Sequence, residues 1–326
     1  MTAASKLLTL DDVYRARERI DGRLHRTPML SSRTLAERVG VPVHFKAELL
    51  QRTGSFKPRG VLTKLASLSA EEKRRGVIGI SAGNHAQALA YCAALEDVDA
   101  LLVMWQGASE QKIEATRAYG AEVDLEATGP AEAFERLKAL MDETGRPLVH
   151  PFDDPLTIAG QGTVGLEIVE DVPETSVIVV PVGGGGLISG IALAAEGRRV
   201  VAAEPELSDA LRQGLEAGKS VPVQPKSIAD GLSAPFAGEH PVRICQAANV
   251  ESVLVSEEEI ADGMRFLYGR AKLACEPAAA VGVAALLGGK VAVEPTDTVA
   301  VVVSGGNVAA DIASAILGSH EGRNPS

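Results

Sequence analysis

The sequence predicts an α/β fold in which parallel sheets carry helices on both faces. Two observations predict it. Short β-rich segments alternate along the chain with segments of helical periodicity, which is the pattern of βαβ units. The β-rich segments are also apolar on both of their faces, as strands covered by helices on each side should be.

The alternation can be followed along the chain as strand-then-helix pairs. In the first half the pairs are 76–81 with 84–95, 99–105 with 109–120, and 121–125 with 131–143. In the second half they are 176–182 with 187–196, 198–204 with 208–218, and 297–304 with 309–317. Capping boxes starting at Ser69 and Ser256 predict two further helix starts. The Pro- and Gly-containing stretch 144–155 offers the clearest domain boundary.

Composition limits the classes of partner. The chain has 326 residues, 46% of them apolar, and a formal net charge of −11. The spread of acidic residues argues against nucleic acid and against an anionic membrane surface, so small molecules are the expected ligands. The three cysteines Cys92, Cys245 and Cys275 are far apart and match no metal spacing. With no secretory leader and no long apolar window, we expect a soluble, cytoplasmic protein.

Four consecutive glycines, Gly183 to Gly186, separate a predicted strand from a predicted helix. Such a turn leaves several backbone N–H groups free to bind one anion, and the helix dipole adds to the attraction. The stretch lacks the dinucleotide pattern GxGxxG and the Lys-Ser/Thr of a nucleotide P-loop. The loop therefore indicates a phosphate-bearing cofactor, with a tight packing turn as the alternative.

Several motifs occur together and in order: TGSFKPRG, SAGNHAQ, VPVGGGGLISG, AAEP, IADG, CEPAAAVG and VVVSGGNV. In this order they make the chain resemble, nearly end to end, the fold type II pyridoxal-5′-phosphate enzymes of the threonine/serine dehydratase and serine racemase family. The resemblance implies two open, doubly wound sheets like those of the tryptophan synthase β chain. It also implies a large domain of residues 1–49 and 149–326, with an inserted small domain of residues 50–148 that closes on substrate.

The resemblance assigns the cofactor site. Lys57, beside Phe56, would form the Schiff base with the cofactor, and Gly183, Gly184, Gly185 and Gly186 would hold its phosphate. Asn84 would hydrogen-bond the 3′-oxygen of the cofactor. Ser304 would face the pyridine nitrogen, and a neutral hydroxyl there favours loss of a β-substituent over transamination.

The loop of Ser81, Ala82, Gly83, Asn84 and His85 would hold the substrate carboxylate. Lys57, freed by the substrate, would act as general base on the α-proton before the β-hydroxyl leaves. Related racemases carry a serine at the position of Ala82, and alanine cannot carry a proton. The resemblance therefore favours elimination over racemisation. Candidate residues of the side-chain pocket are Phe152 and the segment 229–241.

A divalent-cation site is less well supported. Glu204 matches the first carboxylate of the relatives' Mg²⁺ or Ca²⁺ site, and Ser208 could supply a carbonyl oxygen. Where an aspartate is expected, the chain has Ala210, and the neighbouring Asp209 could replace it only with a change of register. A hard cation needs several oxygen ligands, so one carboxylate is weak support.

The sequence thus predicts a pyridoxal-phosphate-dependent lyase that converts L-threonine or L-serine to 2-oxobutyrate or pyruvate and ammonia. Alternatives are a dehydratase of another β-hydroxy amino acid such as 3-hydroxyaspartate, a serine racemase, and a β-replacement enzyme of the cysteine synthase type. A cofactor-binding protein without catalytic activity is a further alternative. The family also implies a homodimer.

Overall fold

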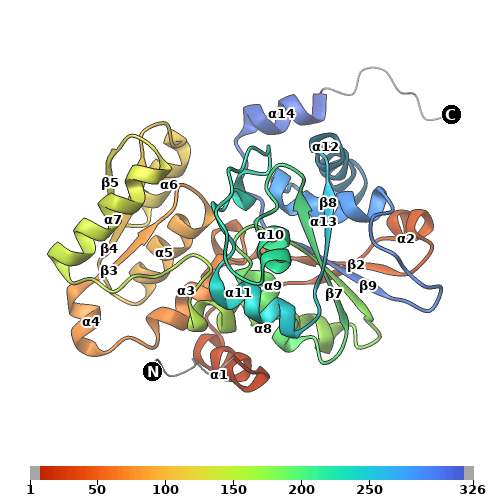
Figure 1. Cartoon of the computed structure of the whole chain (residues 1–326), viewed down its shortest axis with the longest axis horizontal. Coiled ribbons are helices and arrows are strands. Elements are labelled where there is room, and N and C mark those ends of the chain that lie inside the picture. Colours follow the sequence, from red (N-terminus) through yellow and green to blue (C-terminus); the bar gives the residue numbers. More distant parts are fainter. Residues whose placement is uncertain (1–7, 319–326) are drawn as a thin grey trace.

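The computed structural model describes residues 8–318, in which two separate sheets lie at opposite ends of the molecule (Figure 1). The parts of the predicted large domain at 1–7 and 319–326 lie outside the described residues. The larger sheet has the strand order β1-β2-β9-β6-β7-β8. Its strands are β1 (Met29–Ser31), β2 (Val43–Ala47), β6 (Val177–Pro181), β7 (Arg199–Pro205), β8 (Glu251–Val255) and β9 (Val299–Val303). The smaller sheet consists of β3 (Val77–Ile80), β4 (Ala100–Trp105) and β5 (Glu122–Ala127).

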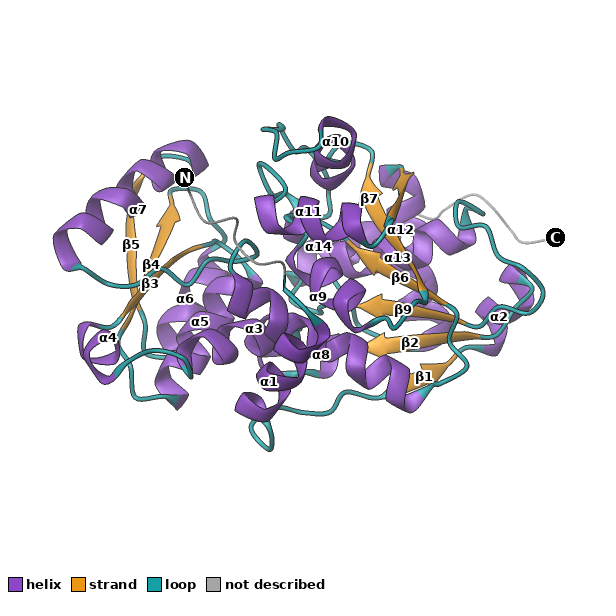
Figure 2. Ribbon diagram, turned by 60° about the horizontal axis from the view of Figure 1, so that its bottom comes forward, coloured by secondary structure: helices purple, strands orange, loops and turns teal. Residues whose placement is uncertain are grey.

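Helices cover both faces of each sheet (Figure 2). In chain order they are α1 (Leu10–Ile20), α2 (Arg33–Val39), α3 (Lys57–Leu65), α4 (Ala70–Arg75), α5 (Asn84–Leu95), α6 (Glu110–Ala118), α7 (Pro130–Thr144), α8 (Pro155–Asp171), α9 (Gly186–Ala194), α10 (Ala210–Ala217), α11 (Glu239–Ala247), α12 (Glu257–Phe266), α13 (Pro277–Leu287) and α14 (Ala310–Gly318). On the larger sheet, α13 packs on one face and α9 on the other; on the smaller sheet, α7 packs opposite α5.

The alternating side chains of the buried strands explain this two-sided cover. In β6, Val177 and Val179 belong to the core on the α13 side, whereas Ile178 and Val180 belong to the core on the α9 side. All four side chains are at most 1% exposed, so neither face can be left to water. The predicted α/β fold with two doubly wound sheets is therefore confirmed.

All six predicted strand-then-helix pairs are present, and both predicted capping boxes form at Ser69 and Ser256. The expectation of parallel strands needs one correction, because β1 pairs antiparallel with β2. The sequence reasoning also missed β1, β2, β8, α8 and α13. Strand β1 has only three residues, and α13 is buried on almost every side, so it lacks the polar face that marks helical periodicity.

Within residues 8–318, no helix is long and apolar enough to cross a membrane. The three cysteines are buried free thiols.

Candidate active site

Lys57 is the first residue of α3 and is partly buried. Pro58 follows it in the first helical turn, where the missing N–H of proline costs nothing. The Lys57 Nζ donates to the carbonyl oxygen of Pro151 at 2.9 Å and lies 5.1 Å from the centre of the Phe56 ring. Loss of hydration lowers the pKa of Lys57 to about 8, although the Glu276 carboxylate opposes this shift. A useful fraction of this amine is therefore neutral near physiological pH.

The turn that leads into Lys57 is tied to the loop that follows β9. The Phe56 N–H donates to the carbonyl oxygen of Ser304 at 3.1 Å, and the Gly306 N–H donates to the carbonyl oxygen of Gly54 at 2.9 Å. Ser304 is 4% exposed. The fold thus brings Lys57 and Ser304 together, although they are far apart in the sequence.

The glycine loop, residues 183–186, joins β6 to α9. A Cβ on Gly184 would overlap the Phe152 ring, and a Cβ on Gly185 would lie 2.6 Å from Pro241 Cβ. Close packing therefore requires these glycines, as the alternative of a tight packing turn expects. Among the described residues, no group accepts a hydrogen bond from the N–H of Gly184, Gly185 or Gly186. These donors lie at the positive end of α9, which is the geometry of an anion site.

Gly185 tests the glycine loop most directly because its φ of +89° lies in the left-handed region. Replacing it with alanine adds strain of about 1–2 kcal/mol and a contact with Pro241 that the helix cannot relieve. We expect G185A to weaken phosphate binding by the apoprotein, measured as the Kd for pyridoxal phosphate, and to lower stability in urea. The control is Gly269→Ala, because a Cβ at Gly269 meets nothing within 4 Å. Equal behaviour of the two variants would contradict this account.

A second set of free donors lies where β3 leads into α5. The Ser81 hydroxyl accepts the Gly83 N–H at 3.1 Å, which shapes the turn. The N–H groups of Ala82, Asn84 and His85 donate to no other group within residues 8–318. Residues 81–84 are partly exposed, so these donors can reach a ligand. The arrangement can hold a carboxylate at the N-terminus of a twelve-residue helix.

The His85 ring points away from this loop. Its Nε2 lies 2.8 Å from the carbonyl oxygen of Val149, and the residue is 2% exposed. Burial, together with the charge of Lys57, lowers the pKa of His85 to about 3, so the ring is neutral. His85 can therefore contribute its backbone N–H to the loop, while its side chain packs in the core.

Two residues without an assigned role in the sequence reasoning hold Asn84. The Asn84 Nδ2 donates to Glu276 Oε1 at 2.7 Å, and Asn84 Oδ1 accepts from Asn307 Nδ2 at 2.8 Å. Burial and the nearby Asp230 raise the pKa of Glu276 to about 7. Both residues lie in motifs that carry the resemblance, CEPAAAVG and VVVSGGNV, so the signal was present, but their partner was not visible in the sequence.

The geometry gives the predicted cation site no support. Glu204 is fully buried, and its two oxygens already accept from the N–H groups of Leu211 (2.8 Å) and Arg212 (3.0 Å) and from the Ser252 hydroxyl (2.7 Å). The Ser208 hydroxyl donates to the Leu232 carbonyl oxygen. The described part of the chain contains no group of three His, Cys, Asp or Glu side chains able to hold a metal ion. Glu204 thus caps α10, and burial raises its pKa to about 7.

The two regions proposed for the side-chain pocket do meet. The rings of Phe152 and Phe236 pack edge to face with centres 5.5 Å apart, and Phe236 also lies 6.5 Å from the Phe134 ring on α7. Phe152 covers the glycine loop, so this aromatic group lies next to the predicted phosphate site.

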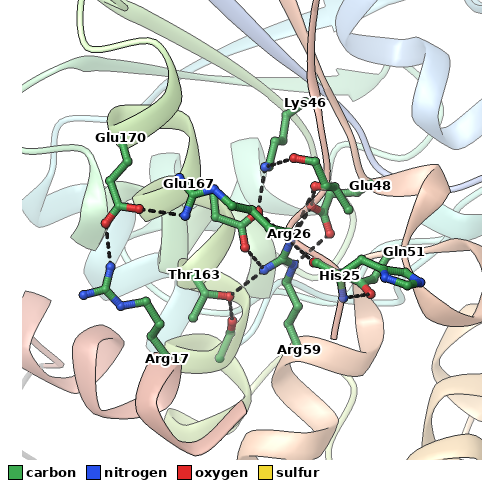
Figure 3. Close-up of polar contacts among 12 residues, drawn as sticks. Arg17, His25, Arg26, Lys46, Glu48, Gln51, Arg59, Thr163, Glu167 and Glu170 are labelled. Atoms are coloured by element: carbon green, nitrogen blue, oxygen red, sulfur yellow. Dashed lines mark hydrogen bonds and ion pairs between the residues drawn. The ribbon is translucent and has the colours of Figure 1, made fainter. Parts of the chain in front are cut away.

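A buried charge network supports the helix that carries Lys57 (Figure 3). Arg59, which is 1% exposed, donates to both carboxylate oxygens of Glu48 and of Glu167, at 2.7–2.9 Å. Lys46 is fully buried and donates to Glu167 at 2.6 Å. The two cations and two carboxylates balance, as burial of charge requires. This network joins α3, two residues after Lys57, to β2 and α8.

Comparison with known proteins agrees with this geometry. The family model described as pyridoxal-phosphate dependent enzyme matches residues 20–305. The chain belongs to the pyridoxal-phosphate-dependent enzymes. The chain is 42% identical to an L-threonine ammonia-lyase from Thermotoga maritima. The match covers 95% of this chain and 78% of that relative.

Two solved structures share the fold. Maize serine racemase has a TM-score of 0.90 and 35% identity, with 97% of this chain and 98% of that chain covered. The T.th. threonine deaminase has a TM-score of 0.85 and 39% identity, with 93% of this chain and 99% of that chain covered. This pyridoxal-phosphate-dependent enzyme therefore has the predicted fold type II architecture.

The residues present fit the cofactor of this family. A lysine amine of lowered pKa contacts Pro151, the neighbour of the Phe152 that packs on Gly184, and the glycine loop has free backbone donors that suit a phosphate. The Ser304 hydroxyl has no partner among the described residues. Lys57 can form the covalent link, the glycine loop can hold the phosphate, and Ser304 can face the pyridine nitrogen.

Proposed function

We propose that the protein eliminates the β-hydroxyl of L-threonine or L-serine, giving 2-oxobutyrate or pyruvate and ammonia. The observation that carries the proposal is that the chain has one amine of lowered pKa, Lys57, while the loop 81–85 has an alanine, Ala82, which cannot carry a proton. One proton carrier suffices for elimination, whereas racemisation needs a second on the other face of the substrate. The likeness to the L-threonine ammonia-lyase of Thermotoga maritima supports the same reaction.

The residues divide the work as follows. When bound, pyridoxal phosphate supplies the electron sink that acidifies the α-proton of an amino acid. Lys57 takes that proton on its Nζ as general base and would return it to the departing β-hydroxyl, which leaves as water. The free N–H groups of Ala82 and Asn84 orient the substrate carboxylate at the start of α5. Ser304, as a neutral partner, leaves the pyridine nitrogen unprotonated and so favours rapid loss of the hydroxyl.

A panel of amino acids tests the proposal. Purified enzyme with pyridoxal phosphate is given L-threonine, L-serine, 3-hydroxyaspartate and an aryl-serine, and kcat/KM is measured from the 2-oxo acid released. We expect L-threonine or L-serine to be preferred. Formation of D-serine as the main product would favour the racemase, and cysteine formation from sulfide would favour β-replacement. The absence of any turnover would overturn the proposal.

We also propose that residues 50–148 form a lobe that closes on substrate against residues 1–49 and 149–326. Lys112 on α6 pairs with Asp230 of the segment 229–241, and so bridges the two lobes. The contact between Phe134 and Phe236 bridges them as well. Crystals with and without a substrate analogue should differ in lobe separation. From the family we further expect a cytoplasmic homodimer, which sedimentation of the purified protein would test.

A further inference from the structure

The Asn84 side chain is held by a hydrogen-bond acceptor on one side and a hydrogen-bond donor on the other. Its Nδ2 donates to Glu276, and its Oδ1 accepts from Asn307. A 180° rotation of the amide group exchanges its oxygen and nitrogen without changing its shape. The hydrogen-bond partners therefore determine the position of each atom. Here Asn307 sets the orientation of the Asn84 amide, and a backbone carbonyl oxygen sets the orientation of Asn307.

That carbonyl belongs to Thr53. The Asn307 Nδ2 donates to the Thr53 oxygen at 2.7 Å, and a carbonyl oxygen can only accept. The same Nδ2 reaches Asn84 with its other hydrogen, at 2.8 Å. Asn84 must therefore turn its oxygen toward Asn307 and its nitrogen toward Glu276. The orientation follows because the Thr53 oxygen can only accept, Asn307 Nδ2 must therefore donate, and Asn84 must present an acceptor to it.

The turn before Lys57 is shaped to admit Asn307. Thr53 has a left-handed φ of 60°, and a Cβ on Gly54 would lie 2.7 Å from Asn307 Oδ1. The Gly306 N–H also donates to the Gly54 carbonyl oxygen. Asn307 thus connects the approach to Lys57 with the start of α5.

One N–H of Asn84 remains after Glu276 has accepted the other. The Asn84 Nδ2 lies over the loop that follows Ser304, 3.1 Å from where a Cβ on Gly305 would be. We propose that Asn307 and Glu276 are positioning residues that orient the Asn84 amide, so that its second N–H meets the 3′-oxygen of the cofactor. This inference rests on the cofactor site of the proposed function, but not on which amino acid is the substrate.

The consequence is chemical. With the cofactor bound, a hydrogen bond from Asn84 would stabilise the 3′-oxygen as an anion, and the proton that this oxygen can share with the nitrogen linked to Lys57 would stay on the nitrogen. Without that donor the 3′-oxygen would hold the proton itself. The two forms of the bound cofactor absorb in the visible and in the near ultraviolet, so their ratio reports the orientation of Asn84 without any substrate.

Asn307→Asp tests the proposal, because aspartate has nearly the same shape but cannot donate. Asn84 then turns its nitrogen toward position 307, and its second N–H leaves the cofactor. We expect the visible-to-ultraviolet absorbance ratio to fall and the Kd of the apoprotein for pyridoxal phosphate to rise about tenfold. Exposed Asn249 provides the matched control, since Asn249→Asp adds the same charge far from these contacts.

A double-mutant cycle separates positioning from a general structural role. In an Asn84→Ala background, N307D should change the absorbance ratio no further, because the group through which it acts is gone. A wild-type ratio in N307D, or an undiminished effect in the Asn84→Ala background, would overturn the inference. If N307D does not fold by circular dichroism, Asn307→Ala takes its place. Alanine removes one of the two groups that hold Asn84 while Glu276 still accepts from its Nδ2, so the absorbance ratio should fall, but by less than in N307D. Wild type with a normal cofactor spectrum but no lyase activity would refute the proposed function alone.

Discussion

Lys57→Ala is expected to reduce turnover by on the order of 10⁴-fold, because alanine can neither link to the cofactor nor take the α-proton. The measurement is 2-oxo acid release from L-threonine, together with the loss of the visible absorbance of the bound cofactor. Lys64→Ala is the matched control on the same helix. Lys64 pairs with Asp154 at 2.7 Å and lies outside the site, so its loss should leave turnover within a few fold of wild type. Comparable turnover in Lys57→Ala would refute the role of Lys57.

The lowered pKa of Lys57 adds a pH test on the apoprotein. Only the neutral amine attacks the aldehyde of pyridoxal phosphate, so the rate of combination should rise as the pH passes upward through about 8. A lysine of ordinary pKa would show this rise only at higher pH. A rate that stays level through this range would contradict the effect of burial on Lys57.

Arg59→Ala is expected to lower the free energy of unfolding by about 3–5 kcal/mol, because it leaves the buried carboxylates of Glu48 and Glu167 without their main partner. Burial by itself raises the pKa of Glu167, but Arg59 and Lys46 hold it below its ordinary value. Without Arg59 one of these carboxyls must take up a proton or admit water. Urea unfolding of the two-lobed chain, followed by fluorescence and by circular dichroism, measures the loss.

The control for Arg59 is Arg26→Ala. Arg26 pairs with Glu170 and Asp171, but its side chain is 50% exposed, so its loss should cost less than about 1 kcal/mol. Similar losses for the two variants would show that the buried network adds little. A large loss for Arg59 alone would support its role in holding α3, and with it Lys57, against β2 and α8.

Much of the fold could be predicted because its signals are local. The apolar runs of β6 and β9, the glycine turn before α9 and the capping box at Ser69 each lie within about ten residues of sequence, where periodicity and turn chemistry act. The missed elements have weak local signals. Strand β2 carries the charged Lys46, which argues against a buried strand when the sequence is read alone. Its burial is explained only by the ion pair with the distant Glu167.

The sequence by itself determined the family, the alternation of strands and helices, and Lys57 as the candidate cofactor lysine, because each rests on neighbouring residues or on motifs read in order. Only the tertiary structure decided which polar groups are paired. Asn84 and Asn307 are 223 residues apart, and Arg59 and Glu167 are 108 residues apart. It also turned the His85 ring into the core and made Glu204 a helix cap. Buried polar groups must find partners, and only folding determines which distant groups meet.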